Sequence, residues 1–252
     1  MANKWVLPLI LSLFIAVLSL AEAAKPVLPL VFILGDSTAD IGTNNLLSGS
    51  TARADFPHNG IDFPNSPRAT GRFSNGLNSA DFLAFWLQEK SRPFLSLSAT
   101  SLQKKKFRGI NFASAGSGLF DLTGQIMMNR NVPFGASLNN QKNVVPLTEQ
   151  IQQFSSVKNN LTALMGAAAT KKFLSKSLIF ISIGSNDLFR YYHSNSSTPK
   201  EKFLSSLLFA YENHLKILHK WKLHVVDLAA ETLYYGGPEY VSPINFAQLA
   251  EA

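Results

Sequence analysis

Residues 27–37 read VLPLVFILGDS, an almost continuous apolar run that ends in a tight turn. Strands whose successive residues are all apolar are typical of parallel sheets that are covered on both faces. The turn then places the Ser37 hydroxyl just beyond the carboxyl end of the strand. This stretch therefore predicts an α/β fold with a nucleophile at the edge of the sheet where ligands bind.

Two later stretches follow the same pattern of a short apolar run and a turn. Residues 107–115 lead into Gly-Ser-Gly at 116–118, and residues 178–183 lead into Gly-Ser-Asn-Asp at 184–187. Because the carboxyl ends of parallel strands meet at one edge, we expect all three turns to converge on one crevice. Residues 49–78, rich in Gly, Pro, Asn and Ser, predict a long structured loop.

Helical patterns separate these strands. Residues 79–89 predict a helix capped by Ser79, with Leu83 on its inner side, and a second helix begins near Thr148. Residues 198–221 open with a capping box and Pro199 at the first helical position. The predicted buried positions of the last two helices are Ile151, Phe154, Leu161, Leu164 and Met165, and Leu204, Leu208, Tyr211, Leu215 and Leu218. The alternation predicts a three-layer α/β/α domain with a mostly parallel sheet.

Composition limits the classes of function. The 252 residues are 46% hydrophobic and 15% charged, which is typical of a globular domain, and the formal net charge is +7. The densest basic run, residues 104–108, lacks the interleaved aromatic residues of nucleic-acid motifs, so we expect a solvated face and no nucleic-acid partner. The chain has no cysteine, which excludes disulfides and thiolate chemistry, and its scattered histidines predict no metal site.

The first 23 residues predict a signal peptide. Lys4 precedes an apolar stretch at residues 5–20, and Ala-Glu-Ala at 21–23 forms a cleavage site. The alternative is a membrane anchor, but the apolar run is short for a bilayer span, so we expect no stable membrane insertion. Residues 24–252 then form one domain of a secreted protein. Asn160 and Asn195 begin sequons for N-glycosylation.

Four blocks of sequence resemble the plant-type GDSL esterases and lipases of the SGNH hydrolase superfamily. They are FILGDSTADIGTNN (residues 32–45), PRATGRFSNG (67–76), GINFASAGSG (109–118) and ISIGSND (181–187). Thr38 replaces the family's usual leucine, and Arg68-Ala69 interrupts the second block. The resemblance covers about residues 27–220. It implies a flavodoxin-like fold and a secreted, cofactor-free serine hydrolase, acting outside the cell (cell wall, apoplast) on acyl esters of lipids or cell-wall material.

The resemblance also implies roles for individual residues. Ser37 would be the nucleophile, and its own backbone N–H, the backbone N–H of Gly116 and the side-chain amide of Asn186 would form the oxyanion hole. Taken singly, Gly116 and Asn186 would be interpreted as ordinary turn residues, and it is their place among the four blocks that favours the oxyanion role. Asp36, Asp40 and Asp187 are interpreted as structural carboxylates that accept hydrogen bonds from backbone N–H groups in the turns.

The family's catalytic Asp and His lie in a D-x-x-H-P-T block, and no such block follows Asn186. No catalytic Asp or His is therefore assigned. From about residue 220 the sequence diverges from the family, so we expect a truncated chain with an incomplete sheet. This leaves an alternative function: a catalytically impaired member that acts, if at all, as a binding remnant.

The pair Asp55–His58 and the reversed pair His224–Asp227 are interpreted as structural, the latter within a short strand at 222–228. His193, His214 and His219 are interpreted as exposed or conventionally packed.

Overall fold

The computed structural model describes residues 30–65, 67–86, 109–124, 143–194, 196–221 and 224–227. Within these ranges the elements are, in chain order, β1 (Val31–Gly35), α2 (Thr43–Leu46), α3 (Ser79–Trp86), β2 (Gly109–Asn111), α4 (Leu147–Met165), α5 (Ala167–Leu174), β3 (Leu178–Ser182), α6 (Ser185–His193), α7 (Lys200–His219) and β4 (His224–Asp227). The signal peptide and the basic run at residues 104–108 lie outside the described ranges.

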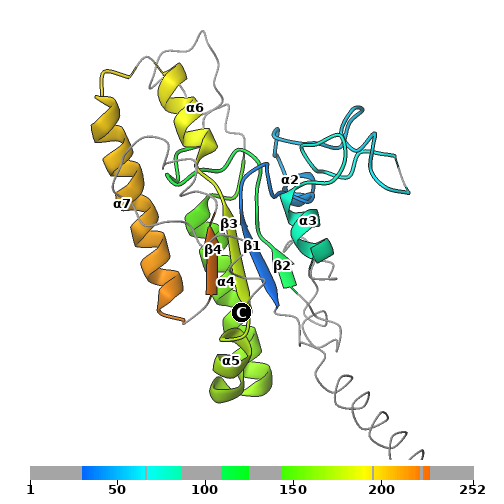
Figure 1. The fold of residues 1–252 in the computed structure, drawn as a ribbon, viewed down its shortest axis with the longest axis vertical. Helices are drawn as coiled ribbons and strands as arrows, with labels where there is room; N and C mark the ends of the chain where they lie inside the picture. Colours follow the sequence, from blue (N-terminus) through cyan, green and yellow to red (C-terminus); the bar gives the residue numbers. More distant parts are fainter. Residues whose placement is uncertain are drawn as a thin grey trace, which may run out of the picture.

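The four strands form one parallel sheet in the order β2-β1-β3-β4 (Figure 1). Val31 pairs with Gly109 on one side and with Leu178 on the other, and Leu178 pairs in turn with His224. The chain leaves β1 for β2 on one side and then returns to the opposite side for β3. Such a reversal of strand order creates a crevice between the two strands at their carboxyl ends, here between β1 and β3.

Apolar side chains cover both faces of the sheet. Phe32 and Ile179 pack with α4, α5 and α7 on one face, while Val31 and Ile33 pack with α3 on the other. Phe154 of α4 is fully buried and meets the ring of Phe32 edge-on, with 4.9 Å between the ring centroids. The predicted α/β class, with helices on both faces of a parallel sheet, is therefore confirmed.

The predicted buried stripes are partly wrong. Leu164 and Met165 at the end of α4 are 47% and 40% exposed, because the helix extends past the edge of the sheet there. On α7, Tyr211 and Leu218 are buried as predicted, but Leu207 takes the third buried position. Three of the predicted α7 positions are only half-buried: Leu204, Leu208 and Leu215.

The predicted helix caps also need correction. Asn78, not Ser79, caps α3, because its Oδ1 atom accepts from the backbone N–H groups of Ala80 and Asp81. The Ser79 hydroxyl instead donates to the carbonyl of Thr38. At α7 no side-chain cap forms, and Pro199 occupies the capping position rather than the first helical one.

The strand after residue 108 is shorter than predicted. Within residues 109–115, the described part of the predicted strand 107–115, Gly109–Asn111 forms the strand. The N–H groups of Phe112 and Ser114 still donate to the carbonyls of Ile33 and Gly35. The predicted strand at 222–228 contains β4 and adds a fourth, parallel strand beside β3. In the part of the chain that the structure describes, no helix is both long and apolar enough to cross a bilayer.

Candidate active site

Ser37 lies in the turn directly after β1. The N–H groups of Ala39 and Asp40 donate to the carbonyl of Asp36 and close this turn. Ser37 is half-buried, and neither its hydroxyl nor its backbone N–H makes a hydrogen bond to any described residue. Both groups are therefore available to a ligand at the carboxyl edge of the sheet.

Gly116 lies in the turn after β2, at the same edge. Its φ of 87° is in the left-handed region that favours glycine. The turn is closed by a hydrogen bond of 3.1 Å from the N–H of Ser117 to the carbonyl of Ser114. Like that of Ser37, the N–H of Gly116 has no acceptor among the described residues.

Asn186 lies in the first turn of α6, which begins at Ser185 directly after β3. Sequence analysis identified this segment as a turn and missed the helix, whose N-cap Gly184 is left-handed with a φ of 117°. The Asn186 amide nitrogen donates to the carbonyl of Ser117 at 2.9 Å and lies 3.5 Å from a carboxylate oxygen of Asp36. One side chain thus connects the residues adjacent to Ser37 and to Gly116, and the three predicted strand ends do meet (Figure 1).

Asp36 holds the Ser37 turn against α6. Its carboxylate accepts from the Ser185 hydroxyl at 2.8 Å and from the N–H and hydroxyl of Thr38 at 3.0 and 2.9 Å. Burial raises the pKa of Asp36, against the hydrogen bonds from Thr38 and Ser185 that lower it.

Two further buried carboxylates order the neighbouring loops, as predicted. Asp40 accepts from the N–H groups of Gly42 and Thr43 and, across the edge, from that of Ala115 at 3.0 Å. Asp187 accepts from the N–H groups of Leu119 and Phe120. Burial raises the pKa of both carboxyl groups, that of Asp40 to about 6.

Gln150 is a buried polar residue that sequence analysis missed. It lies on α4 between Leu147 and Phe154, within the apolar stripe, and is fully buried. Its amide bonds to the backbone of Gly35, two residues before Ser37. A glutamine within an apolar stripe was the available signal, because a buried amide needs several partners.

None of the described histidine side chains bonds to Ser37. His58, His193 and His219 are exposed, and Asp55 pairs with Arg53 rather than with His58. His214 is half-buried and contacts the carbonyl of Leu119 at 3.1 Å. The backbone of His224 lies at the amino end of β4, opposite Leu178, about four residues or ~13 Å below the edge that carries Ser37.

Other predicted features lie away from this edge. Asn160 is exposed on α4, and Asn195 is outside the described residues. Within the described ranges no three His, Cys, Asp or Glu side chains gather as a metal site requires.

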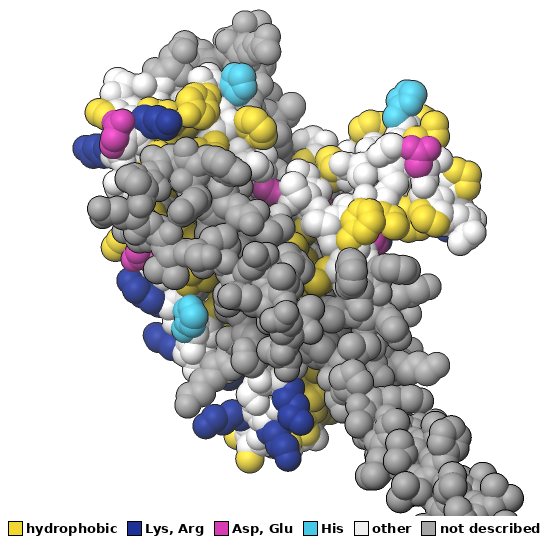
Figure 2. All heavy atoms as spheres, in the orientation of Figure 1, with side chains coloured by type: hydrophobic (Ala, Val, Ile, Leu, Met, Phe, Trp, Pro, Cys, Tyr) yellow, Lys and Arg dark blue, Asp and Glu magenta, His cyan; other side chains and the backbone are white. Residues whose placement is uncertain are grey.

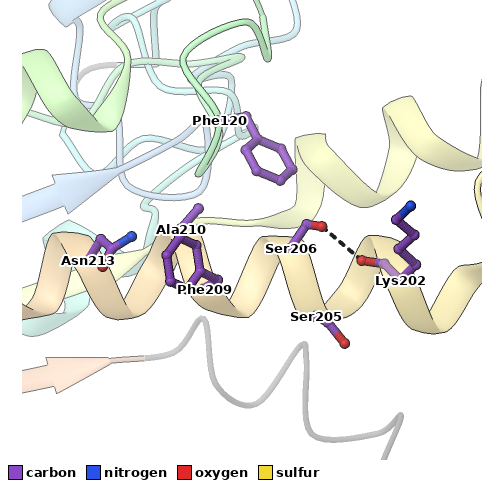
Figure 3. Close-up of a pocket in the computed structure, with 7 residues that line it drawn as sticks. All are labelled: Phe120, Lys202, Ser205, Ser206, Phe209, Ala210 and Asn213. Atoms are coloured by element: carbon purple, nitrogen blue, oxygen red, sulfur yellow. Dashed lines mark hydrogen bonds between the residues drawn. The ribbon is translucent and has the colours of Figure 1, made fainter.

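A shallow hollow of about 510 Å³ lies along α7 beside Phe120 (Figure 3). Ser37, Gly116 and Asn186 do not line it.

Apolar side chains are exposed on both sides of the site edge (Figure 2). Leu122, Phe189 and Tyr192, on the side of α6, are 62%, 56% and 61% exposed. Phe56 and Ile61, in the long loop after α2, are each 56% exposed. Exposed apolar side chains thus occur both on α6 and its neighbouring turn and in the long loop after α2.

The fold and the site define a doubly wound α/β protein with a serine at the carboxyl edge, where strand order reverses between β1 and β3. Several donors at this edge have no acceptor among the described residues. Residues 31–243 match the sequence profile of the GDSL-like Lipase/Acylhydrolase family, and the chain belongs to this family.

Similar proteins from Arabidopsis thaliana carry the same family name. GDSL esterase/lipase At5g55050 is 38% identical over 173 residues, 66% of this chain and 42% of its own. GDSL esterase/lipase At5g37690 is 32% identical over 225 residues, 85% of this chain and 57% of its own. GDSL esterase/lipase 6 is 37% identical over 186 residues, 72% of this chain and 44% of its own. The chain spans about half the length of the curated relatives it matches.

Proposed function

We propose that this edge of the sheet is the nucleophile and oxyanion centre of a serine ester hydrolase. The observation that carries the proposal is the Asn186 amide, which bonds to Ser117 and approaches Asp36. It holds two turns together, and each turn contains a residue, Ser37 or Gly116, whose backbone N–H has no acceptor among the described residues. Donors that are fixed before the reaction begins stabilise a developing oxyanion without having to reorganise.

The chemistry follows from this arrangement. The Ser37 oxygen attacks the ester carbonyl carbon, and the π electrons of the carbonyl move onto its oxygen, which the three donors then stabilise. Collapse of this intermediate expels the alcohol, and water later releases the acid. The bond from Asn186 to Ser117 fixes its amide, while the second hydrogen bond of Nδ2, to the Asp36 carboxylate, is long, with 3.5 Å between nitrogen and oxygen. That weakly held hydrogen is the one available to the oxyanion.

The attack also requires a base that accepts the Ser37 proton. No described histidine bonds to Ser37, and this observation favours the second candidate, an impaired hydrolase that binds esters but acylates slowly. Losing the base of a serine triad lowers the rate by several orders of magnitude, and the oxyanion hole retains a residual effect. The two candidates therefore differ in turnover and share the same site.

The exposed apolar side chains of α6 and of the loop after α2 favour an apolar substrate. The exposed aromatic and aliphatic side chains on both sides of the edge are suited to contact acyl chains or an apolar alcohol. Acyl esters of lipids or cell-wall material have this chemistry. We propose them as the substrate class.

The test compares hydrolysis of 4-nitrophenyl butyrate by the wild-type chain, Ser37→Ala and Ser205→Ala, with and without added imidazole. Ser205 is an exposed serine on α7 and serves as the matched control. All rates are taken above the protein-free rate, because imidazole alone hydrolyses nitrophenyl esters. Turnover without imidazole that Ser37→Ala abolishes and Ser205→Ala keeps supports the hydrolase. Ser37-dependent turnover that appears only with imidazole supports the impaired hydrolase. Turnover that Ser37→Ala keeps in full contradicts both.

We also propose that the protein is secreted and carries glycan on Asn160, which is exposed on α4. Expression in a eukaryotic secretory host and treatment with peptide-N-glycosidase tests this. Peptide-N-glycosidase should increase the gel mobility of the wild-type protein. In Asn160→Gln the increase should be smaller by the contribution of one glycan, and an equal increase would contradict the assignment.

A further inference from the structure

The side-chain amide of Gln150 pairs with the backbone of Gly35. Its Oε1 atom accepts from the Gly35 N–H at 2.8 Å, and its Nε2 atom donates to the Gly35 carbonyl at 2.9 Å. Nε2 also donates to the carbonyl of Val145 at 2.9 Å. The amide thus satisfies both backbone groups of the last residue of β1, two residues before Ser37.

The same amide reaches the turn that contains Gly116. Nε2 lies 3.2 Å from the hydroxyl of Ser117, which is itself 2.9 Å from the Gly35 carbonyl. The N–H of Ser114 donates to that carbonyl as well, at 3.0 Å. Gly35, Ser117 and Gln150 therefore form a closed hydrogen-bonded group directly behind the two turns.

The orientation of the amide is determined by its partners. The Gly35 N–H can only donate, so the atom facing it must be the amide oxygen, and the nitrogen must face the carbonyls. An apolar side chain would leave the Gly35 N–H without an acceptor. A carboxylate would place negative charge against the carbonyl oxygens of Gly35 and Val145. At a fully buried position the orientation is therefore strongly preferred.

We propose that Gln150 is a positioning residue for the oxyanion hole, which rests on the function proposed above. Its bonds end two residues before one proposed donor, the N–H of Ser37, and one residue after another, the N–H of Gly116. Since Gln150 is fully buried behind them, it contacts no substrate. Its effect is to fix the distance between the two N–H groups, so that both point at one oxygen atom.

The test measures the rate at which a 4-nitrophenyl alkylphosphonate labels Ser37. In this reaction the Ser37 oxygen bonds to phosphorus, 4-nitrophenolate leaves, and the hydroxyl proton passes to the imidazole of the buffer. Gln150→Leu is compared with Gln152→Leu, an exposed glutamine on the same helix. The final amount of label counts folded molecules, whereas the rate constant for bond formation reports the geometry of the donors.

We expect Gln150→Leu to lower this rate constant roughly ten- to a hundredfold, because small displacements of catalytic groups have effects of that size. The dissociation constant of the initial complex should change less than about twofold, and Gln152→Leu should match the wild type. A purely structural role predicts a smaller final amount of label at an unchanged rate constant, and this result would overturn the proposal.

A second variant covers the case in which Gln150→Leu does not fold. Gln150→Glu has the same size and keeps an acceptor for the Gly35 N–H. Its rate relative to wild type should recover as the pH falls from about 8 to 5, because the introduced carboxyl gains a proton that it can donate. A pH-independent ratio would overturn the positioning role alone. If the Ser37→Ala variant took up as much phosphonate label as the wild type, the proposed function would be refuted, and the inference with it.

Discussion

The carboxyl edge of the sheet and the interior beneath α4 are neighbouring regions with opposite chemistry. In the interior, the rings of Phe32 and Phe112 each pack edge-on against the ring of Phe154. At the edge, Asp40 and Gln150 are equally buried but bond to the backbone of distant residues, Ala115 and Gly35. The buried Asp36 carboxylate likewise accepts from the distant Ser185 hydroxyl. The interior therefore supplies stability, and the edge supplies geometry. Substitutions in the interior should change stability without changing the reaction rate, whereas substitutions at the edge should change the reaction rate or the pH dependence of stability.

The largest expected effect on stability is in the interior. Phe154→Ala removes a fully buried ring and should lower the free energy of unfolding by about 3–5 kcal/mol. Urea unfolding measures this change, while the rate constant for phosphonate labelling of the molecules that remain folded should stay the same. A reduced rate constant would show that the two regions are coupled.

At the edge, Asn186→Ala should show the reverse behaviour. Removing one oxyanion donor lowers rates by about 10²–10³-fold in other serine hydrolases. We expect the labelling rate constant to fall by an amount approaching that range. The free energy of unfolding should change less than in Phe154→Ala, because Asn186 is only half-buried. A variant that labels at the wild-type rate would remove Asn186 from the oxyanion hole.

Asp40 should make stability depend on pH. Its pKa rises from 3.8 to about 6 on folding, chiefly through burial. Between about pH 4 and 6 the folded state therefore retains a proton that the unfolded state has lost, so the free energy of unfolding should fall as the pH rises through this window.

Asp40→Asn should abolish this part of the pH dependence. It should also lower the free energy of unfolding by about 1–3 kcal/mol, because an amide N–H₂ would then face the N–H of Ala115. Urea unfolding at several pH values measures both effects. A slope that remains in the variant would assign the pH dependence to another group.

The smallest effect is expected where the interior stripe ends. Leu164 is 47% exposed, so Leu164→Ala should change the free energy of unfolding by less than about 0.5 kcal/mol. This variant is a control for Phe154→Ala on the same helix. A loss of several kcal/mol would indicate that Leu164 packs against another part of the protein.

The sequence predicted the parallel sheet and the meeting of its three strand ends, because apolar runs and turn residues are local patterns. It also predicted the bonds of Asp40 and Asp187 to backbone N–H groups in the turns. It did not predict Gln150, whose partner Gly35 is 115 residues away in the chain. Nor did it place Leu164 and Met165 correctly, because helical periodicity does not show where a helix passes the edge of the sheet.

The most direct test of the site is a crystal structure of the phosphonate adduct of Ser37. The phosphoryl oxygen stands in for the oxyanion. It should lie about 3 Å from the backbone nitrogens of Ser37 and Gly116 and from Nδ2 of Asn186. A phosphoryl oxygen that points to solvent, with these three nitrogens out of hydrogen-bonding range, would contradict the assignment of this edge as an ester hydrolase site.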